Sequence, residues 1–253
     1  MTVAHGIPLF IAALLAGALN SVAGGGSLIS FPALIFAGIP PIPANATSAV
    51  ALWPGSVASV GGYREKLPRE ARVLLPLTAA SLLGGFLGAV LLLHTPPLTF
   101  MHVVPWLFLM ATLLFVFGKR LTSGTGRVTG GRHSWAVILA ATIAQLAIAT
   151  YGGFFGGGMG ILMLAVFSMA QLGDIHSMNG VKALLAVAVN AVAIVTFVFA
   201  KVIVWPAALV MIAGAAAGGY GAARLAQRIN PRLVRGFVVA VGITMTIYFL
   251  WRY

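Results

Sequence analysis

Two runs of three glycines interrupt apolar stretches of this chain, and they constrain its fold more than any other feature. The first run lies in Ala23-Gly24-Gly25-Gly26-Ser27, and the second is Gly156-Gly157-Gly158-Met159. Each glycine costs a helix about 1 kcal/mol relative to alanine, so each run predicts a break. In lipid, the freed backbone groups must be buried in protein or must line a cavity. The recurrence in both halves indicates a transporter's binding site, whereas the alternative is close helix packing.

The composition is that of an integral membrane protein. Hydrophobic residues make up 60% of the 253 residues and charged residues only 7%, against about 25% charged residues in soluble domains. Fifteen Lys and Arg residues oppose three acids, and they cluster in short loops, which indicates membrane topology rather than nucleic-acid binding. The absence of cysteine excludes disulfides. The N-terminus lacks a positively charged region, so we expect no cleaved signal peptide.

We expect an all-α polytopic protein with about five membrane segments in each of two repeats. The first repeat is 1–118, a basic cytoplasmic linker is 119–134, and the second repeat is 135–253. The segment 28–39 is too short for a full crossing, which needs about 20 residues, and is expected to be a half-helix joined to extended backbone. The expected segments are 7–22, 28–39, 44–63, 73–93, 98–118, 135–151, 161–172, 179–200, 202–223 and 233–251.

Matching residues at a constant offset predict that the two halves are a duplication. Asn45 matches Asn179 and Pro97 matches Pro231, each 134 residues later, whereas the glycine runs match at an offset of 132. A two-residue insertion or deletion between these features accounts for the difference. Each single match is weak, and the shared offset carries the prediction.

The basic loops predict an inverted arrangement of the halves. The loops 64–72, 119–132 and 224–235 are basic and are expected to face the cytoplasm. Four crossings in each half would put the third loop on the wrong side, whereas five put all three on one side. Because five is odd, the repeats would have opposite orientations, as in many secondary transporters. Both termini are then expected outside the inner membrane.

The motifs around the glycine runs resemble those of a known family. The pattern G-G-G-S, P-x-L-x-x-x-G-I-P-P, A-N-A-T-S and S-x-x-S-x-x-G-Y is similar to the TauE/SafE family of sulfite and organosulfur anion exporters. The second half, from G-G-G-M-G to N-G-V-K-A-L, resembles the second repeat of that family. The resemblance covers essentially the whole chain. It implies an anion permease whose substrates are sulfite, sulfonates such as sulfoacetate, or other small organic anions.

The residues themselves support the binding of an anion. Backbone amides around the glycines can form an oxyanion nest, and half-helices that begin there direct their positive ends at it. Neutral polar side chains would add donors that still allow release. Neither glycine run continues into Lys-Ser or Lys-Thr, which excludes a phosphate-binding P-loop. The candidate substrate-binding residues are Gly24, Gly25, Gly26, Ser27, Asn45, Thr47, Ser48, Gly156, Gly157, Gly158, Asn179, Lys182 and Asn190.

Lys182 is the most informative charged residue, because it lies within an apolar run. Ionisable residues in membrane segments are functional candidates by default. Asn179 precedes Lys182 by three residues, so the two share a helix face. Lys182 occupies the position equivalent to Ser48, and Asn190 that equivalent to Ser56. The alternative interpretation is a lysine that extends to the membrane interface.

Asp174 and His176 are candidates for ion coupling, although an aspartate at this place also suits a helix N-cap. The histidines have no spacing typical of a metal site, and no catalytic constellation emerges. We therefore expect a cofactor-free secondary transporter, an exporter of small anions by alternating access, with proton or sodium coupling, a homodimer as one option and no nucleic-acid partner. The alternatives are an anion channel on the same scaffold and, less favoured, an intramembrane enzyme or assembly factor.

Overall fold

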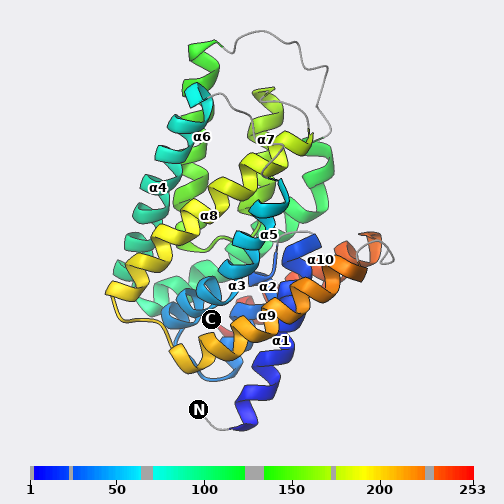
Figure 1. The fold of residues 1–253 in the computed structure, drawn as a ribbon. Helices are drawn as coiled ribbons and strands as arrows, with labels where there is room; N and C mark the ends of the chain where they lie inside the picture. The colour runs from blue at the N-terminus through cyan, green and yellow to red at the C-terminus, as the bar shows by residue number, and fades with distance from the viewer. Residues whose placement is uncertain (1–2, 23–24, 64–70, 123–133, 172–174, 226–230) are drawn as a thin grey trace.

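The structure is a computed structural model that describes residues 3–22, 25–63, 71–122, 134–171, 175–225 and 231–253. The regular elements of these residues are all α-helices (Figure 1). The helices are α1 (Val3–Val22), α2 (Ser27–Phe36), α3 (Pro41–Tyr63), α4 (Ala71–His94), α5 (Pro97–Thr122), α6 (Trp135–Phe154), α7 (Met159–Met169), α8 (Ile175–Phe199), α9 (Trp205–Leu225) and α10 (Pro231–Arg252).

The predicted all-α membrane fold is confirmed, and each expected segment corresponds to one helix. Four described stretches are long and apolar enough to cross a membrane: Ala71–His94, Pro97–Gly118, Trp135–Phe154 and Ser177–Phe199. The helices that follow the glycine runs are short, with 10 residues in α2 and 11 in α7. At 1.5 Å per residue each is about 15–17 Å long, roughly half of the hydrocarbon core. Within the predicted linker 119–134, α5 continues to Thr122, and residues 123–133 lie outside the described part.

Local sequence signals explain where several helices begin. Prolines stand at the first position of α3, α5 and α10, where the missing N–H has no intrahelical acceptor to lose. Ser134 caps α6, since its hydroxyl accepts a hydrogen bond from the Ala136 amide at 3.3 Å. The prolines and the cap place the helix starts close to the ends of the apolar segments.

Glycines allow the helices of the two halves to pack closely. Helix α4 lies against α6, and α1 lies against α9 (Figure 1). A Cβ atom on Gly84 of α4 would lie 2.7 Å from the Leu146 carbonyl oxygen of α6, and one on Gly218 of α9 would overlap the Leu14 carbonyl of α1. Small residues that bring backbones together are the usual contacts between helices in membranes, where apolar burial gives no net drive.

This packing predicts a selective effect of adding one methyl group. Gly218→Ala should lower the free energy of unfolding by about 1–3 kcal/mol, the usual range for overpacking, because the helix α1 backbone must move. Gly221→Ala is the matched control in the same helix, since a Cβ there meets no atom within 4 Å. Thermal unfolding of the purified variants in detergent measures both. Equal midpoints for the two variants would contradict the close α1–α9 contact.

Candidate functional site

The second glycine run forms a sharp break between α6 and α7. Gly156 has φ +81° and Gly158 has φ +78°, a left-handed conformation that glycine adopts without the strain that a Cβ would add. The Tyr151 hydroxyl at the end of α6 donates a short hydrogen bond to the Gly157 carbonyl. The glycines therefore make the turn possible, and the tyrosine holds its middle residue in place.

The backbone amides of this break differ in whether they have a hydrogen-bond acceptor. The Gly156 amide donates to the Tyr151 carbonyl at 3.2 Å, and the Met159 amide donates to the Gly156 carbonyl at 3.4 Å. Within the described part of the chain, the amides of Gly157 and Gly158 have no acceptor. They precede the first turn of α7, where unpaired N–H groups and the helix dipole give a partial positive charge. The break thus offers free donors to a ligand.

Lys182 lies beside this same turn of α7. It approaches α7 at Gly160, since a Cβ atom added to that glycine would lie 3.3 Å from Lys182 Cδ. The Lys182 Nζ donates to Asn179 Oδ1 at 2.9 Å, as the spacing of the two residues predicts. The side chain is half-buried, and α8 begins seven residues before it. The aliphatic part of the side chain therefore packs against α7, and Nζ is held by Asn179 of the same helix.

The first glycine run has a different conformation in its described part. Gly26 has φ −56° and ψ −30°, and it leads directly into α2. Gly25 and Gly26 are buried, and a Cβ on Gly26 would lie 2.5 Å from the Ala16 carbonyl oxygen of α1. Positive φ angles occur only at the second break among the described residues of the two runs. Here glycine serves close packing, and Gly24 lies outside the described residues.

The hydroxyl groups that follow the first break have partners within the protein. Ser48 Oγ lies 2.6 Å from Ser30 Oγ, and the Ser30 hydroxyl lies 3.1 Å from the Gly26 carbonyl that accepts from it. Thr47 Oγ1 accepts from the Val204 amide at 3.1 Å, just before α9 begins. These side chains hold α2, α3 and α9 together. The neutral donors expected in the first half are occupied in this conformation, and Ser27 is half-buried at the start of α2.

A single side chain links the two halves at the breaks. Asn45 of α3 donates from Nδ2 to the Phe154 carbonyl at 2.9 Å. Phe154 ends α6, and carbonyls in the last turn of a helix have no intrahelical donor. A residue that follows the first break therefore satisfies the backbone at the second break. Asn45, predicted as a binding residue, has a structural partner here.

A cluster of phenylalanine rings joins α2 to the second break. The Phe31 ring is fully buried, and its centroid lies 6.0 Å from that of Phe155, which follows α6. Phe31 also contacts Phe100, Phe108 and Phe249 at 6.0–6.2 Å, which are rings of α5 and α10. Edge-to-face and tilted pairs at such distances are favourable. The rings fill the space between the first half-helix and the second break.

Of the remaining candidates, the structure describes the side chain of Asn190. Asn190 Nδ2 donates to the Ala186 carbonyl of its own helix at 2.9 Å. Asp174 and the side chain of His176 lie outside the described residues. The sequence did not single out Ser30 or Tyr151. A signal existed for each, because a lone hydroxyl in an apolar half-helix and a tyrosine just before a break both need hydrogen-bond partners.

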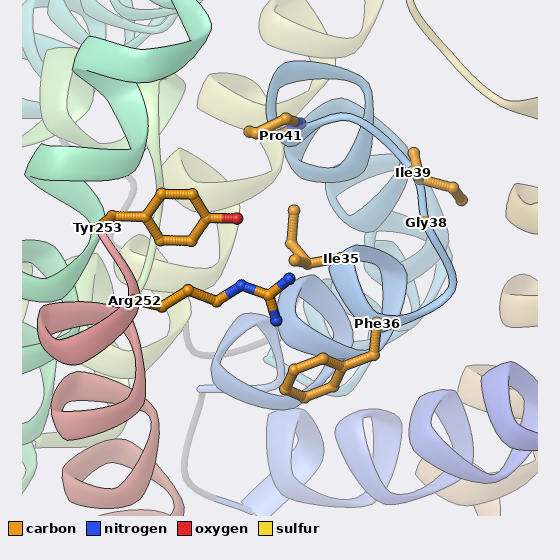
Figure 2. Close-up of a pocket in the computed structure, with 7 residues that line it drawn as sticks. All are labelled: Ile35, Phe36, Gly38, Ile39, Pro41, Arg252 and Tyr253. Atoms are coloured by element: carbon orange, nitrogen blue, oxygen red, sulfur yellow. The ribbon is translucent and has the colours of Figure 1, made fainter.

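A cavity of about 350 Å³ opens at the opposite end of α2 from the first break. Figure 2 shows the Arg252 side chain extending from the end of α10 towards Ile35 and Phe36, with the Tyr253 ring alongside. Arg252 donates a short hydrogen bond to the Tyr248 hydroxyl. Such Arg and Tyr side chains at a helix end are typical of membrane interfaces. This cavity does not include any of the predicted site residues.

The fold and the breaks define a polytopic helical membrane protein, and comparisons with known proteins identify its family. The family described as "Sulfite exporter TauE/SafE" matches residues 9–249, and the chain belongs to this family. "Probable membrane transporter protein ORF9" of Sinorhizobium sp is 29% identical over 96% of this chain and 91% of its own length. "Probable membrane transporter protein YfcA" of Escherichia coli (strain K12) is 27% identical over 96% of this chain and 88% of its own length.

A third relative, a "Probable membrane transporter protein" of Haemophilus influenzae, is 25% identical over 94% of this chain and 91% of its own length. No solved structure matches the chain. The family and these relatives are membrane transporters by name and not enzymes. The resemblance that the motifs suggested is therefore confirmed, and the chain is a membrane transporter of this family.

The Asn45 contact generates a prediction about stability. Asn45→Leu should lower the free energy of unfolding by about 1–3 kcal/mol, because the carbonyl of the half-buried Phe154 loses its donor. Asn190→Leu is the matched control, since Asn190 donates only to a carbonyl within its own helix. Thermal unfolding in detergent compares the two substitutions. A loss in the control as large as that in Asn45→Leu would show that the contact between the halves has no special role.

Proposed function

We propose that the chain is a secondary transporter that exports small anions by alternating access. Sulfite, organosulfonates and related organic acids are the proposed substrates. The observation that carries the proposal is the contact of the Lys182 side chain with the first turn of α7. A lysine and the positive end of a helix then lie close together. A bound anion can supply the opposite charge.

The chemistry of the donors favours an oxyanion. An oxyanion can accept from Lys182 Nζ and from the free amides of Gly157 and Gly158, and charge-assisted hydrogen bonds of this kind are strong. Asn179 Oδ1 is the hydrogen-bond acceptor of Nζ among the described residues. The three acids of the chain, Glu65, Glu70 and Asp174, all lie outside the described part.

The helix contacts support the proposed duplication. Helices α1 to α5 correspond to α6 to α10, so the α1–α9 and α4–α6 pairs are equivalent under exchange of the halves. The glycine contacts follow this rule, since Gly84 meets Leu146 whereas Gly218 meets Leu14. The Trp53 indole donates at 3.3 Å to the Val187 carbonyl, 134 residues later. A residue near a two-fold axis contacts its own equivalent in this way.

The proposed orientation follows from the basic loops and from inversion of the halves. With five segments in each half, the cytoplasmic loops carry the basic residues and both termini lie outside the inner membrane. In the alternating-access scheme, the Phe31–Phe155 contact between α2 and the second break would close one side of the site. A channel on the same scaffold remains the competing proposal. Counterflow and saturation in proteoliposomes favour a carrier, whereas unsaturated conductive flux favours a channel.

The site proposal predicts the effect of removing the ammonium. Lys182→Ala should weaken sulfite binding by about 1–3 kcal/mol, the range for a hydrogen bond to a charged group. Lys182→Arg should retain part of the affinity, because the positive charge persists. Isothermal titration of the purified variants at constant ionic strength measures the change. Lys201→Ala is the control, since Lys201 is exposed in the turn between α8 and α9. Equal affinities of wild type and Lys182→Ala would contradict the proposed binding site.

A further inference from the structure

The charge state of Lys182 matters most when no anion is bound. In the described structure its side-chain carbons pack against α7, and Nζ donates to the neutral Asn179 amide group. If the carrier reorients its empty site across the membrane while Lys182 is protonated, it moves an uncompensated ammonium through an apolar protein. Unpaired charges in such surroundings are costly. Either the empty site does not turn, or the lysine loses its proton first.

The helices packed against α8 supply no carboxylate to balance the charge among their described residues. These helices are α3, α4, α6 and α7. Helix α7 has no titratable side chain, and in α6 the Tyr151 hydroxyl donates to Gly157. Helix α4 carries Arg72 near one end, 4.1 Å from the Trp135 ring, and His94 at the other end, on the Val90 carbonyl. The titratable groups on or beside α8 that lie outside the described side chains are Asp174 and His176.

The partner of Lys182 suits both protonation states of the lysine. Asn179 Oδ1 is an acceptor, so it can receive a hydrogen bond from an ammonium or from a neutral amine. A carboxylate in its place would hold the lysine in the charged form. The amide partner satisfies the lysine nitrogen without fixing its charge.

We propose that Lys182 is the proton-coupling residue and that one proton moves with each anion. This rests on the proposed function, because it assumes that the anion binds at Lys182. The protonated amine binds the anion, and the loaded site crosses. After the anion leaves, Nζ gives its proton to water on the same side, and the neutral amine returns with the empty site. Transport of a monoanion is then electroneutral, and net export requires an outward anion gradient larger than the inward proton gradient.

The mechanism predicts different transport behaviour for lysine and for arginine at position 182. A guanidinium does not lose its proton in a protein, but it keeps the positive charge that binds the anion. The Lys182→Arg variant should therefore still exchange one anion for another, but its empty site should not reorient across the membrane. Lys201→Arg makes the same substitution at an exposed lysine and should behave as wild type.

The test uses the full chain in proteoliposomes with radiolabelled methanesulfonate, which stays a monoanion throughout the neutral pH range. A pH-sensitive dye inside the vesicles reports proton movement. Wild type and Lys201→Arg should accumulate methanesulfonate when the outside is acidic, and downhill uptake should acidify the interior. Lys182→Arg should lower the ratio of net uptake to methanesulfonate exchange by about tenfold or more, because its guanidinium still binds the anion but stays charged. Its exchange rate should also be independent of pH.

The possible failures are distinguishable. If wild type exchanges methanesulfonate without moving protons, or if Lys182→Arg keeps proton-driven net uptake, the coupling role of Lys182 is wrong and the anion site stands. If wild type does not exchange methanesulfonate or sulfite at all, the proposed function fails and the coupling proposal fails with it. Thermal unfolding in detergent is the folding control: if Lys182→Arg unfolds at the same midpoint as wild type and yet loses exchange and net uptake equally, the coupling role is also wrong.

Discussion

The backbone groups that the glycine breaks release must find partners inside an apolar protein, and the arrangement around the breaks follows from this requirement. An unpaired backbone group in such surroundings costs several kcal/mol. The Phe154 carbonyl is satisfied by Asn45, the Gly157 carbonyl by Tyr151, and the Gly26 carbonyl by Ser30 together with backbone amides. These carbonyls thus have side-chain donors, whereas the amides of Gly157 and Gly158 have no acceptor among the described residues.

The two halves use equivalent positions for different purposes. In the first half, Ser48 pairs with Ser30, and the hydroxyls are consumed in fixing α2 to α3. In the second half, the equivalent residue is Lys182, whose ammonium has only a neutral acceptor among the described residues. Among the described residues, the first break is thus closely packed, and Lys182 contacts the helix that follows the second break.

The sequence predicted the helices well because their evidence is local. Apolar length, glycine runs and initial prolines lie within each segment, and all ten segments form helices. The Asn179–Lys182 contact was predictable for the same reason, because residues three positions apart on a helix lie on the same face. A break was expected at both runs, yet Gly26 already has helical dihedral angles, because it is the N-cap residue of α2. Glycine composition shows that a break is allowed and does not specify its dihedral angles.

The long-range contacts could not be predicted from local patterns. Asn45 and Phe154 are 109 residues apart, and nothing near Asn45 indicates that it satisfies a distant helix end. The same holds for Thr47 and the Val204 amide, and for the ring contact between Phe31 and Phe155. These contacts depend on how ten helices pack, and periodicity defines only which face of each helix is apolar. Several residues expected to bind a ligand therefore have structural partners instead.

The most direct test of the central claim is to locate a bound anion. Selenite is a heavy analogue of sulfite, and its selenium scatters X-rays anomalously. In crystals of the transporter soaked with selenite, the account predicts an anomalous peak within hydrogen-bond distance of Lys182 Nζ and of the Gly157 or Gly158 amide. A peak confined to the cavity lined by Ile35, Phe36 and Arg252, with none beside Lys182, would contradict it.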